Sequence, residues 1–169
     1  MTELLLAILL VGMAPASKPA TSPPDTVVVC PTAWKSTLQP WIDYRTTQGH
    51  RIVTISSQGS YQTVRAAIRQ QARKGTTRAI VLIGDAPAAK NGFERQGNTV
   101  ATQHVAARVN IHWGSEPLIA SDNGYADLDN DGTPDTSIGR IPADSARELA
   151  TMIQRILAYE KPRPGYEWK

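Results

Sequence analysis

The sequence lacks several features that would define common classes of protein. It has a single cysteine, Cys30, so it cannot form an intrachain disulfide or a cysteine-based zinc site. It contains neither a G-x-G-x-x-G nor a Walker A sequence, and it therefore gives no support for a nucleotide site. The apolar run from Leu4 to Ala14 falls far short of the ~20 residues that a membrane-spanning helix needs. We therefore predict no membrane span.

Excess positive charge is also scarce, because the formal net charge is only +3. Arg65, Arg69 and Arg73 have the spacing of one helix face. A nucleic-acid groove would usually add interleaved aromatic residues and a larger basic excess. We therefore interpret this stripe as a solvated helix face and expect no nucleic-acid partner.

The N-terminus resembles a secretory signal. The apolar run is followed by the small-x-small sequence Ala14-Pro15-Ala16, which predicts a signal peptide over 1–16 and a Pro/Ser-rich linker over 17–24. The first residues, Met1-Thr2-Glu3, lack the usual Lys or Arg, so a frayed helix or a misplaced start codon is the alternative. We expect a secreted, periplasmic or cell-surface protein with one domain over 25–160.

The mature region alternates strand and helix signals. Apolar, β-branched runs over 26–30, 51–55 and 79–83 predict buried strands, with helical spacing between them. Ser145 and Glu148 form a capping box before a last apolar helix, and a short strand is expected at 137–139. Residues 100–109 suggest an irregular hairpin. The fold class is therefore α/β, a flavodoxin-like parallel sheet of about four strands with helices on both faces.

The densest chemical signal is the acidic run over 127–135. It places carboxylates at positions 1, 3, 5 and 9 of a loop and a glycine, Gly132, at position 6, a spacing that suits a hard cation such as calcium. Ile138 stands where an EF-hand has its bidentate Glu, so a different single-loop site is expected. A solvated turn without an ion is the alternative. The candidate ligands are the side chains of Asp127, Asp129, Asp131 and Asp135 and the carbonyl of Thr133.

Other reactive residues are scattered. Cys30 and Asp85 lie at the ends of predicted strands, where open α/β sheets place their sites. A Cys–His pair could in principle include His50, His104 or His112, but a cysteine that ends an apolar strand is more typical of a core. A small-ligand site near Asp85 is a further alternative without a phosphate-binding loop to support it.

The acidic loop and its flanks resemble the gingipain-type cysteine peptidases. The resemblance extends over about 25–160 and is most specific where Ser121-Asp122-Asn123-Gly124-Tyr125 and the acidic loop lead into Gly139-Arg140-Ile141-Pro142. It implies a caspase-like fold, secretion and, in a complete member, hydrolysis of peptide bonds by a cysteine with a histidine partner. In that family both catalytic residues lie in the second half of the peptidase unit, the histidine in a Gly-His-Gly setting. No catalytic residue can be carried over to this chain, and 161–169 corresponds to a truncated linker.

Two functions follow as hypotheses. The first is the N-terminal portion of a secreted, gingipain-like cysteine endopeptidase, which would act on polypeptides once the second half is supplied. The alternative is a secreted, non-catalytic, calcium-stabilised binding module. In the first case a surface where the second half docks would be uncovered, which predicts self-association.

Overall fold

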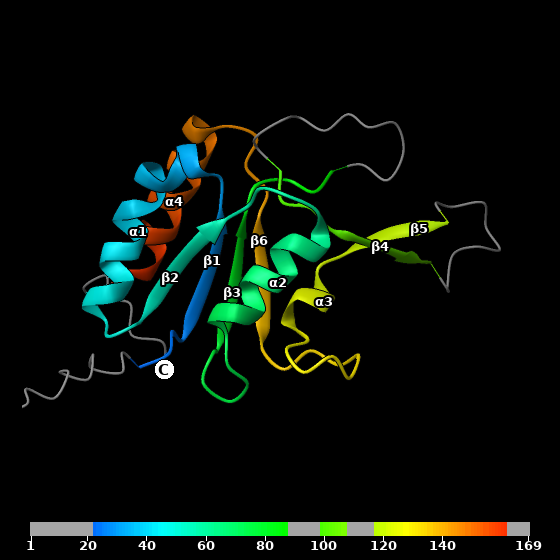
Figure 1. Ribbon diagram of the computed structural model, residues 1–169. Coiled ribbons are helices and arrows are strands. Elements are labelled where there is room, and N and C mark those ends of the chain that lie inside the picture. The colour runs from blue at the N-terminus through cyan, green and yellow to red at the C-terminus, as the bar shows by residue number, and fades with distance from the viewer. Residues whose placement is uncertain (1–21, 88–98, 108–116, 162–169) are drawn as a thin grey trace, which may run out of the picture.

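The computed structural model describes residues 22–87, 99–107 and 117–161. Its centre is a parallel sheet with strand order β2-β1-β3-β6, shown in Figure 1. The strands are β1 (Thr26–Cys30), β2 (Ile52–Ser56), β3 (Ala79–Ile83) and β6 (Ser137–Ile141). The three strands expected from the apolar runs and the short strand expected at 137–139 are therefore confirmed, and they lie in one parallel sheet.

Helices cover both faces of this sheet, as the alternating pattern predicted (Figure 1). On one face α1 (Lys35–Thr47), which follows a 3-10 turn at Thr32–Trp34, packs beside α4 (Ala146–Glu160). On the other face lie α2 (Tyr61–Gln71) and the short α3 (Asn123–Ala126). The central strand β1 is buried along its whole length because both faces are covered.

Two apolar clusters hold these layers together. On the α2 face, Val27, Val29, Ile80 and Leu82 pack against the helix. Their alternating neighbours, with Val28 among them, face α1 and α4 and contact buried residues such as Leu38 and Leu149. The alternation of side chains along a strand thus explains why one apolar run supplies both clusters.

The capping signals work at the expected helix ends. The Ser145 hydroxyl accepts a hydrogen bond from the Glu148 N–H at 3.2 Å and begins α4. The Glu148 carboxylate accepts from the N–H of Asp144, one residue earlier than a standard capping box would place it. In α1, Pro40 lies inside the helix, which continues past it to Thr47.

The hairpin is the element that the sequence placed incorrectly. Of residues 100–107, which the structure describes, Gln103–Ala106 form the strand β4, and its antiparallel partner is β5 (Leu118–Ser121). These two strands form a second sheet that extends away from the main one (Figure 1). The weak alternation over 100–109 could not reveal a partner so far along the chain.

The predicted signal peptide over 1–16 lies outside the described residues, as do the linker up to 21 and the segment 162–169. In the part of the chain that is described, no helix combines the length and apolar character that crossing a bilayer requires.

Candidate functional site

The acidic loop connects α3 to β6 at the end of the sheet where the parallel strands begin (Figure 1). It lies against the turn that precedes β3, because Thr136 donates its hydroxyl to the carbonyl of Thr77 at 3.0 Å. Positive φ angles at Asn130 (71°) and Gly132 (88°) allow the chain to coil tightly there. Open α/β sheets usually place their active sites at the carboxyl ends of the strands, and the loop therefore lies at the opposite end of the sheet.

Three of the predicted ligands come together in this loop. Asp127, Asp129 and Asp135 each offer a carboxylate oxygen, and these oxygens lie within 4.8 Å of one another. Asp127 is buried, with 7% of its surface exposed, and its two oxygens accept the N–H groups of Asn130 and Gly132. Asp135 accepts the N–H groups of Leu128 and Asp129. These hydrogen bonds to Asp127 and Asp135 thus hold the loop in its coiled conformation.

The other two predicted ligands lie differently. The Asp131 carboxylate is exposed and stands outside the three-carboxylate group, and it accepts the N–H of Thr133 at 2.8 Å. Thr133 is itself exposed. A hard cation such as calcium takes six to eight oxygens, so a cation held by the three carboxylates would need further oxygens from the loop backbone or from water.

Two basic side chains from α2 and the turn after it offset the negative charge of the loop. The Lys74 ammonium lies 2.6 Å from a carboxylate oxygen of Asp129 and 2.6 Å from one of Asp135. Its hydrogen bonds to Asp129 and Asp135 raise the pKa of Lys74, and the hydrogen bond from Lys74 is the main cause that lowers the pKa of the Asp135 carboxyl. The mutual repulsion of these closely spaced carboxylates is therefore partly compensated by Lys74.

Arg65 is the second of these basic residues, and here the solvated-face interpretation was wrong. Its side chain is only 19% exposed, and it donates to the carbonyl of Gly124 and to both the carbonyl and the carboxylate of Asp127. Arg69 and Arg73 are exposed, as predicted. Helical spacing could not separate the three, because the acidic loop that Arg65 contacts lies some sixty positions further along the chain.

A second polar network lies near the carboxyl ends of the strands, around Arg140 of β6. Its guanidinium donates two hydrogen bonds to the Asp122 carboxylate, at 2.7 and 2.9 Å. It also donates to the carbonyls of Gly84, Asp85 and Val100. In the sequence Arg140 is recognisable only as part of a family motif, which does not indicate this role. The network joins β6 to the chain after β3 and to the start of α3.

The scattered reactive residues do not form a catalytic pair in the described part of the chain. Cys30 is fully buried, and burial raises the pKa of its thiol to about 11, which confirms it as a core residue. His50 precedes β2 at the opposite end of the sheet, roughly 15 Å away for a five-residue strand, and it pairs with Asp25. His104 lies in β4, and His112 falls outside the described residues. Asp85 is exposed and accepts the N–H of Ala86.

A family model and a solved structure both relate this chain to peptidases. The family model described as "Peptidase family C25" matches residues 19–169. A solved structure titled "Structure of Protease" is similar with a TM-score of 0.60 at 19% identity. That match covers 83% of this chain and 29% of the protease chain, so the sequence spans less than a third of that protein's length. No curated protein sequence matches. The expected fold, a caspase-like α/β sheet flanked by helices, is confirmed by this likeness.

Proposed function

This chain belongs to peptidase family C25, the gingipain family, and from that premise we propose that it is the N-terminal portion of a secreted cysteine endopeptidase. The observation that carries the proposal is the family match over 19–169, together with a sheet that has the fold of a solved protease. The cysteine nucleophile and its histidine partner then belong to the second half of the peptidase unit.

Burial of Cys30 supports a nucleophile located elsewhere. A catalytic thiol must be ionised near neutral pH and must reach a base within ~3 Å, in an environment that lowers its pKa. Cys30 has the reverse properties, because its pKa is raised to about 11 and its Sγ donates to the carbonyl of Pro31. Its role is to fill the core between β1 and the α1 face.

The edge of the sheet supports docking of a second half. Among the described residues β6 pairs with β3 on one side only, so its other edge offers unpaired backbone groups. Sequential strands are usually neighbours in a sheet, and the next strand of the protease would therefore pair with β6. The isolated chain should self-associate through the same edge.

Peptide hydrolysis by two forms of the protein tests this proposal. We expect the 169-residue chain to have no peptidase activity, and the chain extended by the coding sequence that follows Lys169 to hydrolyse peptides and to be inactivated by thiol alkylation. In the extended protein Cys30→Ala should keep its activity, since the nucleophile lies in the second half. Loss of activity in a folded Cys30→Ala variant would refute the assignment.

Secretion can be tested separately. The segment 1–16 should direct export and be removed after Ala16, so that the exported protein begins at Ser17. N-terminal sequencing of the protein recovered outside the cytoplasm measures this directly. Recovery of the whole chain with Met1 intact from the cytoplasm alone would contradict export.

We propose in addition that the acidic loop binds calcium as a structural ion. The grouping of Asp127, Asp129 and Asp135 supports it, and a bound ion would replace Lys74 as the counter-charge of Asp129 and Asp135. Saturation with calcium at a hundredfold excess over its dissociation constant would add about 2.7 kcal/mol to the free energy of unfolding. A non-catalytic, calcium-stabilised module is the alternative function, and it predicts the same shift without activity in the extended protein.

Thermal melts in chelator and in millimolar calcium provide the test. Asp129→Asn removes one carboxylate that contributes few hydrogen bonds to the loop, and it should abolish the calcium-dependent rise of the melting temperature. Asp43→Asn is the matched control, because it makes the same change of charge at an exposed position of α1, outside the acidic loop. Superimposed melts with and without calcium for the unmodified chain would remove the basis of the site.

A further inference from the structure

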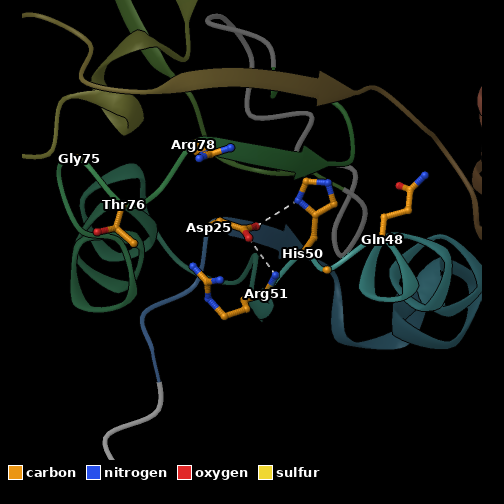
Figure 2. A pocket seen from close by; sticks show the side chains of 8 residues that line it. Asp25, Gln48, His50, Arg51, Gly75, Thr76 and Arg78 are labelled. Atoms are coloured by element: carbon orange, nitrogen blue, oxygen red, sulfur yellow. Dashed lines mark hydrogen bonds and ion pairs between the residues drawn. The ribbon is translucent and has the colours of Figure 1, made fainter.

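A polar pocket of about 370 Å³ lies at the end of the sheet where the strands begin (Figure 2). It is enclosed by the turn between α1 and β2 and by the turn between α2 and β3. Its wall includes Asp25, His50, Arg51, Gly75, Thr76 and Arg78. None of these residues belongs to the acidic loop or to the network around Arg140.

The register of the sheet explains why two arginines line the same pocket. Thr26 of β1 is paired with Ile52 of β2 and with Ala79 of β3. One residue earlier, Arg51, Asp25 and Arg78 therefore form a row across three neighbouring strands. Neighbouring strands are ~4.8 Å apart, so the backbones of the two arginines are separated by roughly 10 Å. Figure 2 shows Asp25 between them.

The acceptor capacity of Asp25 is used within the protein. Its carboxylate accepts the Thr26 hydroxyl at 2.9 Å and the Arg51 N–H at 3.0 Å, and His50 Nδ1 lies 3.4 Å away. Burial would raise the pKa of this carboxyl, but the hydrogen bonds from Arg51, Thr26 and His50 outweigh it and lower the pKa. Asp25 is thus an ionised, internally satisfied carboxylate at the floor of the pocket.

The donors around it are in excess. Within the described residues the Arg78 guanidinium has no hydrogen-bond or ion-pair partner, and Arg51 uses only its Nε, on the carbonyl of Pro23. The pocket thus has two permanent positive charges against one negative charge. Gly49 and Gly75 line the pocket, and a Cβ built on either would meet nothing within 4 Å, so neither turn is packed against other atoms at these positions.

We propose that this pocket is an anion-binding site that takes an oxyanion, either a carboxylate or a phosphoryl group, on the unused guanidinium donors of Arg51 and Arg78. The planar guanidinium matches the spacing of two oxygens on such a group and forms short charge-assisted hydrogen bonds to it. The site is independent of the proposed peptidase function, since it lies where the strands begin, at the opposite end of the sheet from the carboxyl ends of β3 and β6.

Titration of the 169-residue chain with inorganic phosphate and, separately, with acetate tests the site. The measurement is the shift of the Gly75 and Thr76 amide signals in ¹H–¹⁵N NMR spectra, at a constant ionic strength set with chloride. Arg78→Gln removes the unpartnered guanidinium and should weaken anion binding about tenfold, the usual value of one charge-assisted hydrogen bond. Arg51→Gln is a second variant with the same expectation, and circular dichroism verifies that both are folded.

Arg69→Gln is the matched control, because it makes the same change of charge at an exposed position of α2 outside the pocket. It should leave the affinity unchanged. Shifts with both anions identify a carboxylate-binding site, and shifts with phosphate alone identify a phosphoryl-binding site. The proposal is overturned if neither anion shifts these two amides, or if Arg69→Gln weakens binding as much as Arg78→Gln and Arg51→Gln do.

Discussion

Replacement of Arg140 by alanine should cost this protein a large share of its stability. The guanidinium forms five hydrogen bonds, two to the Asp122 carboxylate and three to backbone carbonyls. Only 12% of the Arg140 side chain and 23% of the Asp122 side chain are exposed to solvent. Removal of one partner from a buried ion pair typically costs 3–5 kcal/mol, and partial exposure of Asp122 favours the lower end, about 3 kcal/mol.

That loss is large against the roughly 5–15 kcal/mol that stabilises a typical domain. Arg140→Lys keeps the charge but loses the planar fork that bonds both Asp122 oxygens, so its loss should be intermediate. Arg147→Ala is the matched control. Its side chain is exposed on α4, and we expect a change within about 0.5 kcal/mol.

Urea unfolding followed by tryptophan fluorescence and far-UV circular dichroism measures these losses. A double-mutant cycle with Asp122→Ala isolates the pair, because Thr102 also donates a hydrogen bond to Asp122 and that contribution cancels in the cycle. The coupling energy should be about 1–3 kcal/mol. Simple additivity of the two single losses, or a loss for Arg140→Ala as small as for Arg147→Ala, would refute the reasoning.

Three further predictions concern single residues. The Cys30 thiol should react with a soluble disulfide reagent only on unfolding, since it is fully buried and its pKa is raised to about 11; rapid labelling of the native chain would contradict this. Gly124→Ala should lower the free energy of unfolding by about 1–3 kcal/mol, although alanine favours helices, because its Cβ would collide with the Tyr61 hydroxyl; an unchanged urea midpoint would count against this packing. Asp25→Asn should destabilise the chain at neutral pH, where the lowered pKa of Asp25 contributes to stability. This difference is complete above the unfolded pKa of about 3.9 and disappears as the pH falls through the lower folded pKa, so the two urea midpoints should keep their separation from pH 7 to about pH 4 and approach one another at lower pH.

The sequence predicted the main elements because their signals are local. A strand buried on both faces must be apolar throughout, as Thr26–Cys30 is, and a helix end must satisfy its own N–H groups, as Ser145 does for α4. The weak pattern over 100–109 did not reveal that β4 pairs with β5, because that pairing depends on residues beyond position 116. The edges of elements and the pairing of short, exposed strands thus needed the structure.

The chemistry of the candidate site divides in the same way. The spacing of the acidic loop predicted a group of four carboxylates, and those of Asp127, Asp129 and Asp135 do lie together because one short loop contains all three. The sequence was also sufficient to identify the family, since the motif around Arg140 is contiguous. Only the tertiary structure decided which charges neutralise one another. Lys74 reaches the loop from a position 55 residues earlier, and Arg51 and Arg78 come to flank Asp25 through the register of three strands. Ion pairs and pockets of this kind depend on distances in space, and the spacing of residues along the chain does not encode those distances locally.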